Sequence, residues 1–157
     1  MEPEKIAGMV EQRCPYARRT HVRVRTVAQE DGRVTMALEE SPDNLNAFGL
    51  VHAGAICGFA ETAAGAALLT HLDPSEYIVL NTFLNVRFTA PGRGELTCST
   101  RVTPEEFGAV MEEVISEGKA DKTVDFKVRD ESGRVVASGQ ATFRIMPTPD
   151  EYRKYFA

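Results

Sequence analysis

The chain has 157 residues, of which 43% are hydrophobic and 26% are charged, and its net charge is −5. This size and composition are typical of one soluble globular domain with a substantial core, so we expect a single domain over residues 1–157. The acidic balance leaves no basic stripe along the chain, and we therefore expect no nucleic-acid partner.

The cysteines and the apolar segments also exclude several classes of protein. Cys14, Cys57 and Cys98 lie far apart and lack metal-binding spacing, so we expect neither a disulfide framework nor a metal site. The N-terminal residues have no apolar core long enough for a signal peptide. The apolar run over residues 54–72 contains Glu61 and is rich in Ala and Gly, which favours a buried helix over a membrane span. We expect a cytoplasmic protein without a membrane partner.

The first half of the chain contains a helix, a hairpin and a second, long helix. Apolar residues at helical spacing predict a short amphipathic helix over residues 4–12. Alternating apolar residues in 22–25 and 34–38 flank Asp31-Gly32, which predicts a β-hairpin with one wet face. A helix of about 28 Å follows over residues 54–72 and is closed by Asp73-Pro74.

The second half is dominated by strands. Residues 78–89 predict a strand, and strict alternation places one set of residues on its apolar face: Ile78, Leu80, Thr82, Leu84, Val86 and Phe88. Residues 96–103, 123–129 and 135–145 predict three more strands, and the tail over 147–157 predicts a short helix. Pro104 and Gly118 bound an amphipathic helix between them. Its apolar face is expected to pack on the sheet, with a wall of an acyl pocket as the alternative.

These elements together predict an α+β fold. About six strands can all be joined by hairpins or short links, and the long helix has no polar face wide enough for water. One antiparallel sheet should therefore wrap around that helix. The Ala and Gly residues of the helix would let the strands approach its backbone closely.

Glu61 is the residue that most needs an explanation. A carboxylate on an apolar helix is costly to bury unless it is paired or borders a cavity. His52 and Ala53 lie where the preceding loop meets the helix, and free backbone N–H groups there suit an oxygen that becomes negative during a reaction. Glu61 lies about two turns further along, so we hypothesise that a dimer brings it to the helix start of the other subunit.

The motif around these residues resembles that of a known family. Residues 46–55, NAFGLVHAGA, followed by Glu61-Thr62-Ala63, are similar to the signature of hotdog-fold thioesterases, in which N-x-x-G-x-x-H-G-G precedes an acid on the long helix. The phenylacetate-degradation and 4-hydroxybenzoyl-CoA thioesterases are the most similar group. Residues 84–91 and 133–139 resemble the family's strand before a proline and its final hairpin, so the resemblance covers about residues 20–146.

The resemblance implies a fold, an activity and roles for particular residues. The fold is the hotdog fold, and the activity is hydrolysis of an acyl-CoA or acyl-carrier thioester by a homodimer or a dimer of dimers, with CoA as part of the substrate and no cofactor. Glu61 would be the general base or nucleophile, and the Ala53 N–H beside His52 would polarise the carbonyl. Asn46 would orient the water or the acid. Arg87 and Arg93 would bind the phosphates of the substrate. The full set of expected substrate-binding residues is Gly54, Asn81, Thr82, Arg87, Phe88, Thr89, Ala90, Pro91 and Arg93.

Other readings of the same residues stay open. Glu61 could be a structural acid paired with an arginine, His52 could only hold the loop, and Asn46 could be a turn residue. Thr82 competes with Asn81 for a place in the pocket, because the two point to opposite faces of a regular strand.

Two departures from the family pattern bear on the function. Ala53 replaces a glycine, and its backbone N–H can serve as a donor only if its φ angle suits an L-residue. The helix over 104–118 stands where the family has a Gly-Arg or Gly-Lys pair on the CoA phosphates, and this second departure favours the alternative of a non-catalytic acyl- or lipid-binding module. A hydratase ranks last, because the sequence lacks the Asp/His pair that this chemistry needs.

Overall fold

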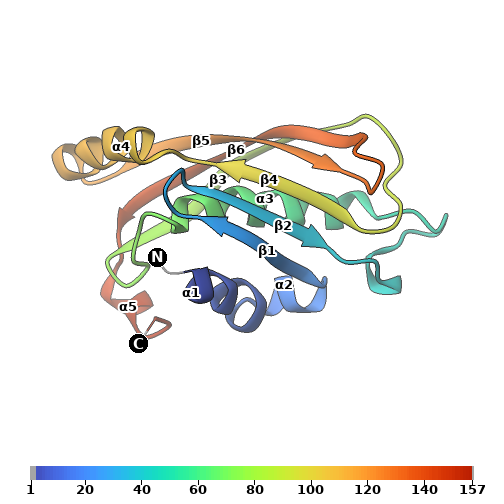
Figure 1. Cartoon of the computed structure of the whole chain (residues 1–157). Helices are drawn as coiled ribbons and strands as arrows, with labels where there is room; N and C mark the ends of the chain where they lie inside the picture. Colours follow the sequence, from blue (N-terminus) through green and yellow to red (C-terminus); the bar gives the residue numbers. More distant parts are fainter. Residues whose placement is uncertain (1–2, 157) are drawn as a thin grey trace.

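A six-stranded antiparallel sheet forms the body of the computed structural model, which describes residues 3–156 (Figure 1). Its spatial order is β1-β2-β4-β5-β6-β3, so β1 and β3 are the edge strands. The strands are β1 (Val22–Ala28), β2 (Arg33–Leu38), β3 (Tyr77–Phe88), β4 (Leu96–Arg101), β5 (Ala120–Arg129) and β6 (Val135–Pro147). Alternate residues of β5 are buried, as the period of a strand with one solvated face requires.

The long helix α3 (Ala53–Leu69) packs against one face of this sheet and contacts β2, β3, β4, β5 and β6. Much of its buried surface is alanine, which allows the strands to pack close to the helix backbone. A sheet wrapped around one long helix is the hotdog fold, so the fold expected from the sequence is confirmed. No helix within residues 3–156 has the combination of length and apolar character that crossing a bilayer demands.

The side of α3 that the sheet leaves open is only partly buried. Cys57, Gly58, Glu61, Thr62 and Gly65 form this side, and they recur at the spacing of one helix face. Three short helical segments of the N-terminal region lie beside β1: α1 (Pro3–Ala7), η1 (Gly8–Arg13) and α2 (Pro15–Arg19) (Figure 1). The predicted helix over 4–12 thus corresponds to α1 and η1, whereas α2 was not predicted.

Strand β3 contains a bulge that its sequence pattern did not predict. Asn81 pairs with Phe143 and Phe83 pairs with Thr142, so Thr82 is an extra residue on one strand. Val79 before the bulge and Leu84 after it both pack against the core. The prediction that alternation runs unbroken from Ile78 to Phe88 is therefore wrong, because one additional residue reverses the faces.

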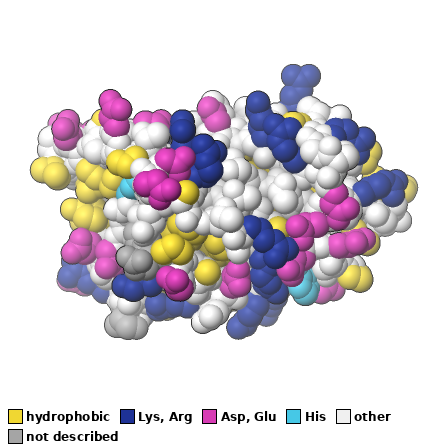
Figure 2. Space-filling model, in the orientation of Figure 1, with side chains coloured by type: hydrophobic (Ala, Val, Ile, Leu, Met, Phe, Trp, Pro, Cys, Tyr) yellow, Lys and Arg dark blue, Asp and Glu magenta, His cyan; other side chains and the backbone are white. Residues whose placement is uncertain are grey.

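The helix α4 (Pro104–Glu117) confirms the predicted bounds of the amphipathic helix. The Thr103 side chain accepts from the Glu106 N–H while the Glu106 carboxylate accepts from the Thr103 N–H, and Gly118 ends the helix with φ 78°. Figure 1 shows α4 projecting at one end of the sheet, where Figure 2 shows hydrophobic side chains at the surface. Phe107 stacks on His71 with ring centroids 5.0 Å apart, and Val110, Met111 and Val114 also pack against the core. Ile115 on the same helix is 78% exposed, so only part of the apolar face is covered.

Two further short helices complete the fold. A single turn, η2 (Pro42–Asn44), precedes the loop that leads into α3. The helix predicted for the tail is α5 (Asp150–Arg153). The residues that follow α5 return the C-terminal segment to the N-terminal helices, because Arg13 donates a hydrogen bond to the carbonyl oxygen of Tyr155.

Candidate functional site

The loop before α3 is held in shape by the side chain of Asn46. Its Oδ1 accepts from the N–H groups of Phe48 and Leu50, at 2.9 and 3.2 Å, and Gly49 adopts a φ of 70° that favours glycine. The amide nitrogen of Asn46 makes no hydrogen bond within residues 3–156. Asn46 is thus a turn residue with one donor group still available.

His52 begins α3 as its N-cap residue. The His52 Nδ1 accepts from the Gly54 N–H at 2.8 Å, and the His52 N–H donates to the carbonyl oxygen of Asn44 at 2.7 Å. These two hydrogen bonds hold the loop in place, and the Gly54 N–H is therefore already paired. The Ala53 N–H, in contrast, has no hydrogen-bond partner in the described part of the chain, and Ala53 is exposed.

The segment after β3 lies against this loop. The Val51 N–H donates to the carbonyl oxygen of Gly92 at 3.0 Å, and the Thr89 hydroxyl donates to that of Val135 at 2.8 Å. Arg87 and Arg93 are exposed and form no ion pair with any described residue. The structure therefore brings the predicted residues around 46–54 and 88–93 together at the start of α3.

Glu61 lies apart from this group, at a separate cavity of about 240 Å³. Its eight-residue separation from Ala53 corresponds to about 12 Å along the helix axis. Within residues 3–156 no lysine, arginine or histidine pairs with Glu61, so the reading of a structural ion pair finds no support. Burial raises the pKa of Glu61 above its ordinary value, and a hydrogen bond with Thr62 lowers it only in part.

Asn81 and Thr82 lie outside this cavity, at the bulge of the edge strand. The Asn81 amide donates to the carbonyl oxygen of Phe83, and the Thr82 hydroxyl donates to that of Thr142, each at 3.2 Å. Both side chains are exposed. Neither residue lines the Glu61 cavity. Within one chain, therefore, neither of the two alternatives for a pocket residue on β3 is supported.

Several residues near Glu61 were not singled out from the sequence. The Tyr16 hydroxyl lies against Gly58 on the open side of α3. Burial raises the pKa of Tyr16, and the nearby Cys57 and Glu61 raise it further. The only sequence signal for this arrangement is that Gly58 and Gly65 share one helix face with Glu61, leaving room for other side chains.

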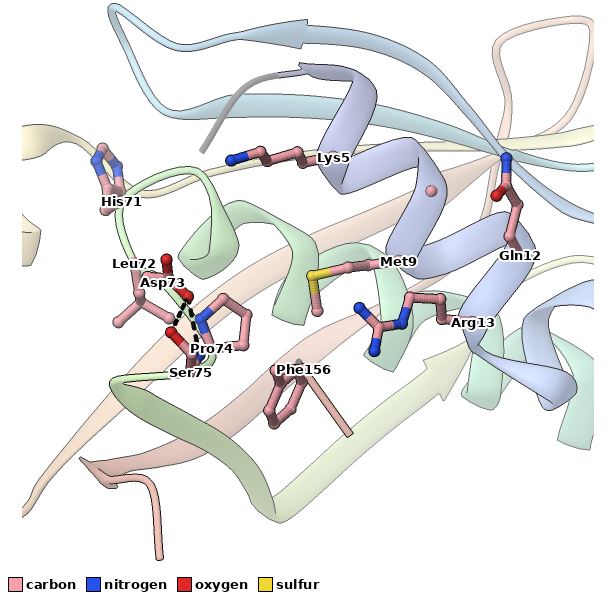
Figure 3. A pocket seen from close by; sticks show the side chains of 11 residues that line it. Lys5, Met9, Gln12, Arg13, His71, Leu72, Asp73, Pro74, Ser75 and Phe156 are labelled. Carbon is pink, nitrogen blue, oxygen red and sulfur yellow. Dashed lines mark hydrogen bonds between the residues drawn. The ribbon is translucent and has the colours of Figure 1, made fainter. Parts of the chain in front are cut away.

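The Glu61 cavity adjoins a larger and more polar one of about 570 Å³ (Figure 3). The larger cavity lies between α1, η1 and the loop after α3, and its polar side chains include Lys5, Arg13 and Asp73. The Asp73 carboxylate accepts from the backbone and hydroxyl groups of Ser75. Residues 3–156 bring together no group of three His, Cys, Asp or Glu side chains that could hold a metal ion.

The overall structure is similar to those of several solved proteins. A protein of unknown function from Pseudomonas aeruginosa, described as a probable thioesterase, is 25% identical with a TM-score of 0.84, and the match covers 94% of this chain and 97% of that one. A thioesterase from Haemophilus influenzae shares the fold at 16% identity and a TM-score of 0.73, over 94% and 92% of the two chains. A mutant thioesterase from Pseudomonas aeruginosa also shares the fold, at 16% identity and a TM-score of 0.73, and the match covers 94% of this chain and 96% of that one.

The comparison of sequences gives a family without a described activity. No curated protein matches this chain. The family model described as "Domain of unknown function (DUF4442)" matches residues 4–145. This range contains α3 with Glu61 and all six strands, except the last two residues of β6. The chain therefore belongs to the DUF4442 family, and its fold is that of the hotdog thioesterases.

Proposed function

We propose that this protein hydrolyses an acyl-CoA thioester to a carboxylic acid and free CoA. The observation that carries the proposal is Glu61, an acid that lies at the edge of an apolar cavity and forms no ion pair with any residue in 3–156. A carboxylate in such a place is costly for stability, and perturbed acids of this kind concentrate at functional sites. The phenylacetate-degradation and 4-hydroxybenzoyl-CoA thioesterases are the group we infer to be closest in mechanism.

Glu61 can act on the thioester in two ways. As a general base, its carboxylate takes a proton from water while the water oxygen attacks the carbonyl carbon. The resulting oxyanion collapses, the carbon–sulfur bond breaks, and the thiolate of CoA takes the proton back from Glu61. As a nucleophile, the carboxylate attacks the carbonyl carbon itself and expels the thiolate, and water then cleaves the anhydride. The raised pKa of Glu61 makes its carboxylate a stronger base and also a stronger nucleophile, so it is compatible with both routes.

The Ala53 N–H is the group we propose for the oxyanion. It has no partner within residues 3–156, it lies at the positive end of α3, and the His52 side chain fixes the helix start beside it. The free amide nitrogen of Asn46 in the same loop is available to orient the attacking water. Arg93 follows Gly92, which contacts this loop, and Arg87 lies near the end of β3; both are exposed and would contact the phosphates of CoA.

A homodimer would join the two halves of this site. Glu61 and Ala53 of one chain lie about 12 Å apart along α3, too far to act on one carbonyl group. Strand β3 is an edge of the sheet and exposes the apolar side chains of Leu80, Phe83 and Phe88. We propose that a second copy covers this edge and sets Glu61 of one subunit opposite Ala53 of the other.

Release of free thiol from a panel of acyl-CoA substrates tests the function. The native protein should release thiol, and Glu61→Gln, which keeps the shape but loses the base, should reduce kcat/KM by at least about 100-fold. Glu113→Gln, on the exposed surface of α4, is the matched control and should leave the rate unchanged. Equal rates for the native and Glu61→Gln proteins would remove Glu61 from the mechanism.

The alternative function is a non-catalytic acyl- or lipid-binding module. The apolar cavity beside Glu61 supports it, because such a cavity could hold an acyl group without turnover. The helix α4, which suggested this reading from the sequence, projects from the end of the sheet opposite residues 88–93 and leaves that segment uncovered (Figure 1). A binding module would be stabilised against heat by acyl-CoA without any release of thiol.

A further inference from the structure

The cavity beside Glu61 is elongated along α3. The helix residues that line it follow one face for two turns: Glu61, Thr62, Gly65, Ala66 and Leu69. Glu61 stands at one end of this row and Leu69 at the other, which corresponds to about 12 Å along the helix. Gly65 keeps the middle open, since a Cβ atom there would already lie 3.3 Å from the Phe143 ring.

The walls of this channel are almost entirely apolar. Tyr77, Ile78, Val79 and Phe143 of β3 and β6 form one wall. Met9, Val10 and Cys14, from η1 and the residue after it, form another. Glu61 is the one charged residue among the described lining residues, so the ligand portion that fits here is a hydrocarbon chain with its polar end at Glu61.

Residues from three distant parts of the sequence lie between the far end of the channel and a second cavity. Met9, Pro74 and Phe156 line both the channel and the larger polar cavity beyond it. Figure 3 shows Met9 extending from η1 on one side and Phe156 approaching from the C-terminal segment on another. Beyond these side chains lie Lys5, Arg13 and Asp73, an environment that does not favour a hydrocarbon chain.

We propose that this channel binds the acyl chain of the substrate and that Phe156, with Met9, sets its maximum length. The assignment of the chain as a thioester's acyl group rests on the proposed hydrolase function. An extended hydrocarbon chain advances about 1.3 Å for each carbon–carbon bond, so a channel of about 12 Å holds an unbranched chain of roughly ten carbons. The cavity volume of about 240 Å³ is large enough for a chain of this length.

A series of straight-chain acyl-CoA substrates measures this limit directly. Each methylene that enters the channel should raise kcat/KM about fourfold, and the rise should end near ten carbons. Phe156→Ala opens the channel into the polar cavity and should raise kcat/KM for chains longer than the limit about tenfold, with little change for short chains. Tyr155→Ala removes the neighbouring, exposed ring and should keep the native length profile.

The outcomes separate the two proposals. If thiol is released but Phe156→Ala keeps the native length profile, the length limit assigned to Phe156 is overturned while the hydrolase function stands. If no acyl-CoA is hydrolysed, the hydrolase function fails, and binding of 1-alkanols of increasing length, followed by thermal stability, tests the channel alone. The channel is supported if the rise in melting temperature increases with alkanol length up to about ten carbons in the native protein and continues beyond that length in Phe156→Ala. A rise in melting temperature that does not depend on alkanol length overturns it.

Discussion

The Tyr16 hydroxyl lies against Gly58, one helical turn before Glu61 on the open side of α3. A methyl group at Gly58 would overlap that hydroxyl, so glycine at this position allows α2 to pack on α3. We expect Gly58→Ala to displace the Tyr16 ring into solvent and to return the pKa of Tyr16 from its raised value towards the ordinary 10.0. Spectrophotometric titration of the tyrosines measures the shift, and Tyr16→Phe identifies the transition. A pKa of Tyr16 that Gly58→Ala leaves unchanged contradicts this packing.

Ala53→Pro removes the proposed oxyanion donor with little change in fold. Proline is favoured at the first position of a helix, and the extended conformation of His52, with φ −64° and ψ 137°, suits a residue before proline. Because the Ala53 N–H makes no hydrogen bond within residues 3–156, the free energy of unfolding should change by less than about 1 kcal/mol. The value of kcat should fall by about 100-fold or more. Ala53→Ser keeps the N–H and is the control, expected to stay within a few fold of the native rate.

Mixed dimers test whether two subunits share each site. A dimer of one Glu61→Gln chain and one Ala53→Pro chain has one site with both defects and one site with neither, if the two residues come from different subunits. Equal amounts of the two inactive variants, unfolded and refolded together, should then recover about a quarter of the native activity. A site contained within one chain predicts no recovery. Refolding each variant alone supplies the baseline.

Glu61→Gln should stabilise the protein at neutral pH. Burial raises the pKa of Glu61 above 4.5, so the folded chain binds this proton more tightly than the unfolded chain does. The stability contributed by protonation is complete below pH 4.5 and is lost as the pH rises through the raised pKa. The neutral glutamine avoids that loss, and urea unfolding at neutral pH should give a larger free energy of unfolding for the variant. Below pH 4.5 the two proteins should differ little; a less stable variant at neutral pH would contradict the prediction.

Glu106 should show the opposite dependence on pH. The Thr103 N–H, together with Lys122, lowers the pKa of Glu106 to about 2. Its contribution to stability is therefore present above pH 4.5 and is lost as the pH falls through about 2. Glu106→Ala breaks the capping box of α4 and should cost about 1 kcal/mol in urea unfolding at neutral pH. Glu105→Ala, one position earlier and outside the capping box, is the comparison and should cost less.

The local elements of this fold could be predicted because their signals lie in short stretches of sequence. Asp31-Gly32 marks the turn between β1 and β2, and Pro104 and Gly118 bound α4, as the structure confirms. The wrapping of one sheet around α3 followed as well, because an apolar helix without a wide polar face needs a sheet around it, and the resemblance implied that this is the hotdog fold. The position of Glu61 at a cavity agrees with the cost of burying a lone acid.

What the sequence could not determine depends on residues that are distant along the chain. The bulge at Thr82 reverses the faces of β3, and a bulge is decided by pairing with β6 rather than by the strand's own pattern. The channel beside Glu61 is built by Met9, Phe143 and Phe156, which have no local signal in common. Periodicity reports which face of an element is apolar, whereas only tertiary packing decides which side chains meet around Glu61 and how much space they leave.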